Sequence, residues 1–330
     1  MTTQIIYLVL SFVLTAILGK IIIPILKKLK VGQNERACGP RAHLKKQGTP
    51  TMGGIMMMIS IIVFVSIYCI LNPNKESIVP ILAVAVASLG FGIVGFVDDF
   101  KKVVLKNTEG LNPKLKMFGL LIISVIYTMF LINYAGLGTD IIIPIIDYNL
   151  TLPIWIYIPF TILVMLASTN AVNLTDGVDG LAGSVSAIMI TAISIIAMKL
   201  GFPSISVLGT IVVGSCAGFL IYNFHKAKVM MGDTGSLLLG GVISSMTIYL
   251  KQPLMLLLIA IIPVVETLSV IMQVTYFRFT GKRLFRMSPL HHHFELTGWR
   301  ENKVVAVFSL ITLVAAICAI IIVLRFIDFP

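Results

Sequence analysis

Two carboxylate motifs carry the residues of this sequence that are best suited to chemistry. The first, VDDFKK, holds the adjacent Asp98 and Asp99, with Lys102 close behind. Adjacent carboxylates repel each other unless a cation or a proton lies between them, and Mg²⁺ takes carboxylates together with substrate phosphates as ligands. The motif therefore suits a magnesium site that handles phosphate. The alternative is an ion pair between Lys102 and one of the aspartates on a helical turn.

The second carboxylate motif, MGDTGS, places Asp233 between Gly232 and Gly235, with Ser236 at the start of the next apolar run. A carboxylate on a glycine-rich loop before a helix can hold a metal ion, while the free backbone N–H groups at the helix start bind phosphate. The alternative is that Asp233 only caps the helix.

Polar residues recur at helical spacing in the segment NAVNLTDGVDGLAG. If the segment is helical, Asn173, Asp176 and Asp179 lie at i, i+3 and i+6 and share roughly one face. One such residue would be enough to cap the following helix. Three of them on one stripe indicate a binding surface.

A basic segment with a tight turn adds a further anion-binding motif, HLKKQGTPTMGG. Lys45 and Lys46 precede a Gly-Thr-Pro-Thr turn that contains Thr51. Lysines, hydroxyls and backbone N–H groups together suit a phosphate. A basic loop at the membrane surface is the alternative.

A run of three histidines, His291, His292 and His293, lies well inside the chain, so it is not a terminal tag. Adjacent side chains lie about 100° apart on a helix and on opposite faces of a strand, so the three cannot readily converge on one zinc ion. They can donate hydrogen bonds and partial positive charge to an anionic ligand near neutral pH. Adjacency predicts that the three are unequal, and a polar surface loop is the alternative.

The chain that must position these motifs has 330 residues, of which 58% are hydrophobic and only 12% charged, with a mean hydropathy of +1.01. We therefore expect an all-α polytopic membrane protein that forms one domain over residues 1–330. Segments of roughly 20 mostly apolar residues can span a membrane. Ten segments qualify: 4–26, 53–71, 78–97, 115–133, 153–171, 181–199, 204–223, 236–250, 254–277 and 304–327. In the ninth, Glu266 could mark a kink, a polar contact between helices or the edge of a lipid groove.

Positive charge is distributed unevenly over the loops between these spans. The loops on one face hold 20 of the 25 Lys and Arg residues, and the same face holds all five motifs. The positive-inside rule makes these loops cytoplasmic and puts both termini outside. The asymmetry also accounts for the net charge of +11 without a nucleic-acid partner. On the other face, GLGTDIIIPIIDYNLTLP predicts a small external β-hairpin, with a plain loop as the alternative.

Carboxylates, lysines, glycines and imidazoles gathered on one membrane face suit phosphoryl transfer, in which positioning and charge neutralisation do most of the work. In this order along essentially the full chain, the motifs resemble those of the phospho-N-acetylmuramoyl-pentapeptide transferases. The matching segments are GTPTMGG (48–54), VDDFKK (97–102), NAVNLTDGVDGLAG (170–183), MGDTGS (231–236) and PLHHHFELTGW (289–299). DDxxK alone is shared by a wider superfamily of polyprenyl-phosphate sugar-phosphate transferases.

The resemblance implies an Mg²⁺-dependent reaction in the bacterial cytoplasmic membrane. Undecaprenyl phosphate would attack the β-phosphate of UDP-N-acetylmuramoyl-pentapeptide, releasing UMP and forming lipid I, the first lipid-linked peptidoglycan precursor. The resemblance implies that Asp233 is the main Mg²⁺ ligand and that Asp99 supports the metal. It implies that Asp98 positions or deprotonates the lipid phosphate, and a covalent route through Asp98 stays open.

The resemblance also implies substrate-binding roles. Contacts to phosphates or carboxylates are expected of Lys46, Thr51, Lys102 and Lys114. The nucleotide and its surroundings are expected to involve Asn173, Asp176, Asp179, Asn223, Ser236 and Gln273. The pyrophosphate or sugar is expected to meet His291, His292 and His293. Met230 stands where some relatives carry an aromatic residue, so the resemblance supplies no ring there to stack on uracil, although a thioether can pack on one.

Three other functions are compatible with parts of the sequence. A sister enzyme of the same superfamily would use UDP-N-acetylglucosamine, but the GTPTMGG and HHHFE contexts favour the muramoyl enzyme. A transporter would place ionisable groups near the bilayer midplane, whereas here only Lys20 and Glu266 lie well inside spans. A scaffold for cell-wall enzymes would not need five phosphate-suited motifs. The residues leave homodimerisation open.

Overall fold

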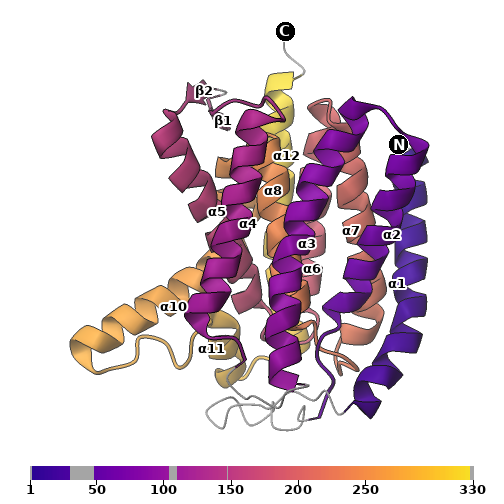
Figure 1. The fold of residues 1–330 in the computed structure, drawn as a ribbon. Helices are drawn as coiled ribbons and strands as arrows, with labels where there is room; N and C mark the ends of the chain where they lie inside the picture. Colours follow the sequence, from indigo (N-terminus) through magenta and orange to yellow (C-terminus); the bar gives the residue numbers. More distant parts are fainter. Residues whose placement is uncertain (1, 30–47, 104–109, 147, 328–330) are drawn as a thin grey trace.

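Long apolar helices make up most of the structure, as the hydropathy pattern predicts. A computed structural model describes residues 2–29, 48–103, 110–146 and 148–327, so the predicted phosphate contact Lys46 lies outside the described residues. The long helices α1 to α8 and α12 run side by side in a bundle, whereas α10 leaves it obliquely (Figure 1). The α-helices of the described residues are α1 (Thr2–Lys28), α2 (Gly54–Leu71), α3 (Lys75–Val103), α4 (Pro113–Asn133), α5 (Ile154–Thr175), α6 (Leu181–Lys199), α7 (Pro203–Asn223), α8 (Gly232–Tyr249), α9 (Leu256–Ile259), α10 (Ile261–Thr280), α11 (Leu290–Leu296) and α12 (Glu301–Ile327).

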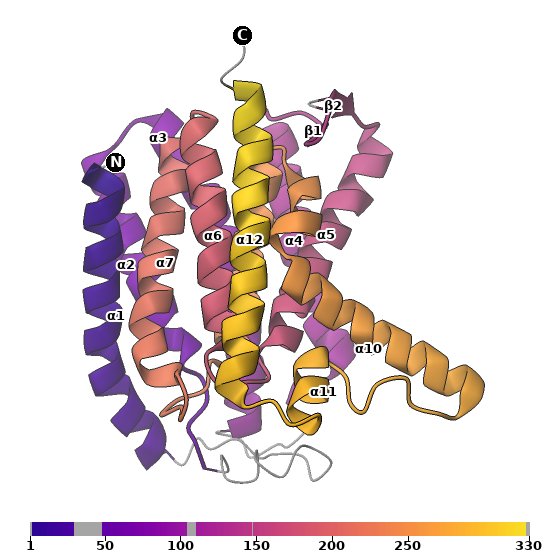
Figure 2. The same ribbon diagram turned by 180° about the vertical axis from the view of Figure 1, so that it is seen from behind.

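Within the described residues, nine helices are long and apolar enough to cross a membrane. They are α1 to α7, α10 and α12. Helix α1 begins and α12 ends at the same end of the bundle, and α11 lies at the other end (Figures 1 and 2).

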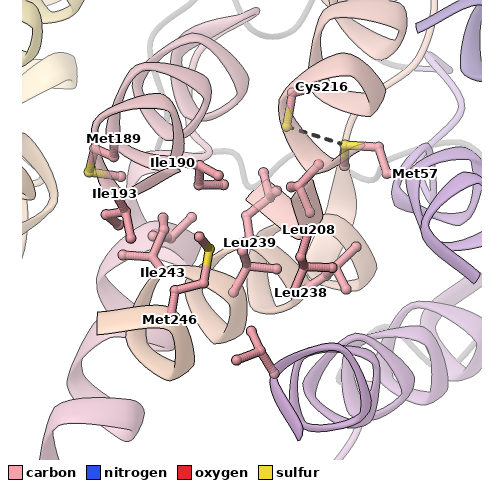
Figure 3. Close-up of a cluster of buried hydrophobic side chains, with 14 of the residues drawn as sticks. Met57, Met189, Ile190, Ile193, Leu208, Cys216, Leu238, Leu239, Ile243 and Met246 are labelled. Atoms are coloured by element: carbon pink, nitrogen blue, oxygen red, sulfur yellow. Dashed lines mark hydrogen bonds between the residues drawn. The ribbon is translucent and has the colours of Figure 1, made fainter. Parts of the chain in front are cut away.

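Helix α8 lies at the centre of the bundle and is enclosed by other helices. Every residue from Thr234 to Tyr249 is buried. Figure 3 shows apolar side chains of α2, α6 and α7 packed with those of α8. In the same cluster the Cys216 thiol lies 3.9 Å from the Met57 sulfur. The glycines of α8 let other helices approach, and its hydroxyls bond to carbonyls one turn back, such as Ser244 Oγ to Gly240 O at 2.9 Å. A helix surrounded by protein needs less hydropathy than one facing lipid, which explains why α8, the predicted span 236–250, is not among the nine most apolar long helices.

The ninth predicted span, 254–277, is not one helix. A 3-10 turn (Pro253–Met255) leads into the short α9, and α10 starts anew at Ile261. Proline at position 263 lacks the N–H that would bond one turn back, so the helix breaks before it. Helix α10 then runs obliquely out of the bundle (Figure 2).

The predicted external hairpin is present. Strands β1 (Asp140–Ile143) and β2 (Tyr148–Thr151) pair antiparallel, with Asp140 opposite Thr151. The Thr151 hydroxyl donates to the Asp140 carboxylate at 2.7 Å, and the Lys251 ammonium lies 3.1 Å from the same carboxylate. Both contacts lower the pKa of Asp140. The hairpin lies at the end of the bundle where α1 begins (Figure 1).

Candidate active site

The ends of three helices converge because glycines remove the side chains that would hold them apart. A Cβ on Gly95 of α3 would lie 2.1 Å from the carbonyl oxygen of Asp233, and one on Gly54 of α2 would lie 2.2 Å from the amide nitrogen of Gly235. The 48–54 motif is also joined to the MGD motif through its backbone, since Gly54 N–H donates to Met231 O at 3.0 Å. Three motifs far apart in the sequence thus meet where α8 begins.

Two carboxylates and two lysines form the polar centre of this junction. The Asp98 and Asp233 carboxylates both contact the Lys102 ammonium, at 2.5 and 2.9 Å. The Lys116 ammonium lies 2.8 Å from Asp233 and 3.7 Å from Asp98. The backbone N–H of Leu111 also donates to Asp98 at 2.7 Å. The ion pair between Lys102 and Asp98, one turn apart, was the alternative prediction, and it is one edge of this four-residue cluster.

Asp99 faces the backbone of α8. Its two oxygens accept hydrogen bonds from the N–H groups of Asp233 at 3.1 Å and Thr234 at 2.9 Å, and from the Thr234 hydroxyl at 2.6 Å. The first N–H groups of a helix have no partner within the helix, and a carboxylate there also favours the helix dipole. Asp99 therefore caps α8 from a neighbouring helix, while Asp233 lies in the first turn of α8 and not on a loop before it.

Gly232 makes this cap possible. Its φ angle is 74°, and a Cβ at this position would lie 2.6 Å from Asp99 Oδ2 and 2.8 Å from Thr51 Oγ1. Thr51, a predicted phosphate contact, is thus buried beside the cap.

We expect Gly232→Ala to be more destabilising than an ordinary left-handed glycine substitution. Gly136 has a φ of 64° and nothing within 4 Å of its Cβ position, so Gly136→Ala isolates the backbone strain, about 1–2 kcal/mol. The clash in Gly232→Ala should add about 1–3 kcal/mol. Thermal unfolding in detergent checks the order, and equal losses of stability would contradict it.

The polar stripe predicted for residues 173–179 is not on one helix face. Helix α5 ends at Thr175, and Gly180 (φ 79°) precedes α6 without a side-chain cap. Asn173 still reaches the centre, because its amide donates to Asp233 Oδ1 at 2.7 Å and to Ser236 Oγ at 2.8 Å. Asp176 keeps some exposed surface, but the pKa of its carboxyl is well above the ordinary value because protein encloses it and Asp233 and Asp99 lie near.

Asp179 and Asn223 hold the loop before α8 onto the turn before α6. Asp179 accepts the N–H of Ala227 at 3.0 Å, and Asn223 accepts the N–H of Gly180 at 3.0 Å. Asp179, His225 and Glu301 each place one ligand atom within 4.8 Å of the other two, so they form an acidic group that could hold a metal ion.

The three histidines have three different environments, as their adjacency predicts. His291 is fully buried and contacts Glu266. His292 lies 2.8 Å from Glu295, and His293 accepts the Arg286 N–H at 3.2 Å. The His291 ring lies against Gly177, where a Cβ would be 2.1 Å from Nε2. The histidine segment therefore packs on the α5–α6 turn.

The remaining predicted residues lie around the centre at different distances. Gln273 accepts the N–H groups of residues 284 and 285 at 3.0 and 2.9 Å and lines a separate pocket of about 390 Å³. Met230 is buried, with its N–H donating to Pro50 O at 2.7 Å. Lys114 is exposed in the first turn of α4.

Three residues of this site were missed by sequence reasoning. Lys116 entered only a count of loop charges, Thr234 was not singled out, and Glu266 was not connected to the histidines. Only Glu266 carried a signal, as an ionisable residue inside an apolar run.

Comparison with known proteins defines the class and then the family. A family model described as glycosyl transferase family 4 matches residues 81–251, which include Asp98, Asp99 and Asp233. The chain is thus a member of this class of transferases, and nine of its described helices are long and apolar enough to cross a membrane.

Curated relatives extend over almost the whole chain. The phospho-N-acetylmuramoyl-pentapeptide-transferase of Acetivibrio thermocellus is 46% identical over 311 residues, which cover 94% of this chain and 92% of the relative. The proteins of the same name from Clostridium botulinum (strain Alaska E43 / Type E3) and Halalkalibacterium halodurans are 47% and 46% identical, with 94% and 95% of this chain and 93% and 95% of each relative covered. The chain belongs to the phospho-N-acetylmuramoyl-pentapeptide-transferase family, a family of bacterial membrane enzymes.

Proposed function

We propose that this chain transfers phospho-N-acetylmuramoyl-pentapeptide from its UDP conjugate to undecaprenyl phosphate, releasing UMP and forming lipid I. The observation that carries the proposal is the contact of Asp98 and Asp233 with Lys102 and Lys116 at one end of the bundle. Two phosphorylated substrates must be held together while negative charge shifts between them, and catalysis of this kind rests on positioned charges.

In the reaction, an oxygen of undecaprenyl phosphate bonds to the β-phosphorus of the nucleotide sugar. The bond from that phosphorus to the oxygen bridging to the α-phosphate breaks, and UMP leaves with that oxygen and its charge. Lys102 and Lys116 neutralise charge on the phosphates. Both oxygens of Asp98 are engaged, one by Leu111 N–H and one by Lys102, which favours a positioning role over covalent attack.

Mg²⁺ fits the donor set of this centre. The Lys102 ammonium contacts Oδ2 of Asp98 and Oδ2 of Asp233, so carboxylate oxygens from α3 and α8 already share one cation. Asp98 and Asp233 would hold the ion, and Asp99 would support it by fixing the start of α8. Bound there, Mg²⁺ would supply charge neutralisation on the phosphates.

The polyprenyl tail would reach the centre along α10. A groove of about 340 Å³ between α5 and α9–α10 is lined almost wholly by apolar side chains, among them Ala171 and Val172. The next residue along α5 is Asn173, which bonds to Asp233. A lipid in this groove would have its headgroup beside the carboxylates, on the face that the basic loops mark as cytoplasmic in the bacterial cytoplasmic membrane.

The test is UMP release by the purified enzyme in detergent with both substrates present. We expect release that requires Mg²⁺ and undecaprenyl phosphate. UDP-N-acetylglucosamine is the matched control, because turnover with it alone would identify the sister activity. Substrate-dependent flux into liposomes without UMP release would instead identify a transporter.

A further inference from the structure

A glutamate inside a candidate membrane span faces a buried histidine of the triplet. Glu266 on α10 is 1% exposed and His291 on α11 is 0% exposed. Both contacts of the pair centre on one oxygen, since Glu266 Oε1 accepts the His291 backbone N–H at 3.1 Å and lies 3.2 Å from His291 Nδ1. An ionisable residue is costly in an apolar environment, and its presence there marks a functional contact with a partner.

The contact with Glu266 determines which imidazole nitrogen is presented to the rest of the site. A carboxylate oxygen only accepts hydrogen bonds, so Nδ1 carries the proton that it shares with Oε1. Nε2 then carries the ring's lone pair; it is buried and has no hydrogen-bond partner among the described residues. It points at Gly177, directly after Asp176 in the α5–α6 turn.

We propose that Glu266 is a positioning residue that fixes the tautomer and the orientation of His291, so that Nε2 is held as a hydrogen-bond acceptor against the α5–α6 turn. A buried carboxylate behind an imidazole orients the ring in this way in other catalytic sites. The tautomer and the ring orientation follow from the contact with Glu266. Only the assignment of the donor that Nε2 meets to the nucleotide sugar rests on the proposed function.

The same helix gives this pair a second connection. Pro263, Val264, Thr267 and Leu268 of α10 line the apolar groove proposed for the lipid tail, while Glu266 faces α11. Helix α10 therefore borders the lipid groove and also contacts His291 of α11, which packs against the α5–α6 turn. Loss of the Glu266 contact should affect how the nucleotide substrate is handled without removing any residue of the carboxylate centre.

Two substitutions of Glu266 separate hydrogen bonding from charge. Glu266→Gln keeps a carbonyl oxygen that can accept both bonds, whereas Glu266→Leu removes both bonds at similar size. Ser269→Ala is the matched control, because Ser269 is a buried polar residue of the same helix that bonds only to the Glu266 backbone.

The first readout is ¹⁵N solid-state NMR of histidine-labelled enzyme in bilayers, with the His291 signals assigned from His291→Asn. We expect a protonated Nδ1 in the wild type, in Glu266→Gln and in Ser269→Ala, and a changed tautomer ratio in Glu266→Leu. Gly177→Ala displaces the ring from the other side and should change the same signals with Glu266 intact, which keeps the test informative if the leucine variant does not fold. Unchanged His291 signals in the folded Glu266→Leu or Gly177→Ala protein would overturn the proposal.

The second readout compares kcat/KM for UMP release with the melting temperature. Glu266→Leu leaves the backbone N–H and Nδ1 of His291 without their acceptor, so its melting temperature should fall. At a temperature where this variant is folded, its kcat/KM should fall about tenfold or more. Glu266→Gln and Ser269→Ala should lose far less. Equal losses in the leucine and glutamine variants would refute the positioning role. If the wild type itself releases no UMP, the proposed function fails, and the NMR result still decides the role of Glu266.

Discussion

Asp233→Asn is expected to lower kcat for UMP release by roughly 10²–10³-fold, the usual cost of removing one preorganised electrostatic group from an active site. The Asp233 carboxylate contacts Lys102, Lys116 and Asn173 at 2.7–2.9 Å. An asparagine of the same shape replaces a charge that both ammonium groups contact by a neutral amide, leaves Asp98 as their remaining carboxylate, and removes one proposed Mg²⁺ ligand. The Mg²⁺ concentration required for half-maximal rate should therefore rise as well.

The matched control for this variant is Asp140→Asn. Asp140 also pairs with a lysine, Lys251, but at the hairpin at the other end of the bundle, so it should leave turnover and Mg²⁺ dependence unchanged. Folding of both variants is checked by thermal unfolding in detergent. Near-wild-type turnover of Asp233→Asn with normal Mg²⁺ dependence would rule out its role at the centre of the site.

The membrane helices could be predicted from sequence because a run of apolar residues long enough to cross a bilayer has few other stable conformations. The exceptions have physical causes. The segment 254–277 has the composition of a span, but Pro263 breaks it, and composition does not give the direction of α10. Helix α8 is surrounded by protein, so it can contain glycines and serines that a lipid-facing helix would avoid. These residues lower its mean hydropathy, which is the quantity from which a membrane span is predicted.

The residues of the site could be predicted more fully than their contacts. Charge asymmetry puts Asp98 and Asp233 on one face, but their approach depends on Gly95, whose missing side chain lets α3 touch α8. Nothing local in the sequence pairs residues that are more than 100 positions apart. Asp99 shows the same limit, since its motif suits a metal ligand and only the fold directs its oxygens to the N–H groups of α8.

The stripe Asn173, Asp176 and Asp179 shows where a local rule fails. The i, i+3, i+6 spacing assumes that the helix continues, yet α5 ends at Thr175 within a glycine-rich segment. Asn173 alone keeps its helical direction and reaches Asp233. The other two lie in the turn that the histidine segment packs against, so the segment does form a polar surface, with a different geometry.

Lys116→Gln is expected to lower kcat/KM for UMP release by about 10- to 100-fold, the cost of losing a hydrogen bond to a charged group. Lys116 is only 18% exposed at its side chain and contacts both Asp233 and Asp98. The sequence favoured Lys114 instead. Residues two positions apart on a helix point about 200° away from each other, so α4 cannot direct both lysines to the same carboxylates.

Lys114→Gln is the matched comparison, since it makes the same chemical change two residues away on the same helix. Lys114 is exposed, and an exposed charge contributes little, so we expect a loss of a few-fold at most. Steady-state UMP release measured for both variants at several ionic strengths separates the two positions, because salt screens the exposed charge more than the half-buried one. A larger loss at Lys114 than at Lys116 would contradict the geometry of the carboxylate centre and return the phosphate contact to the residue that the sequence favoured.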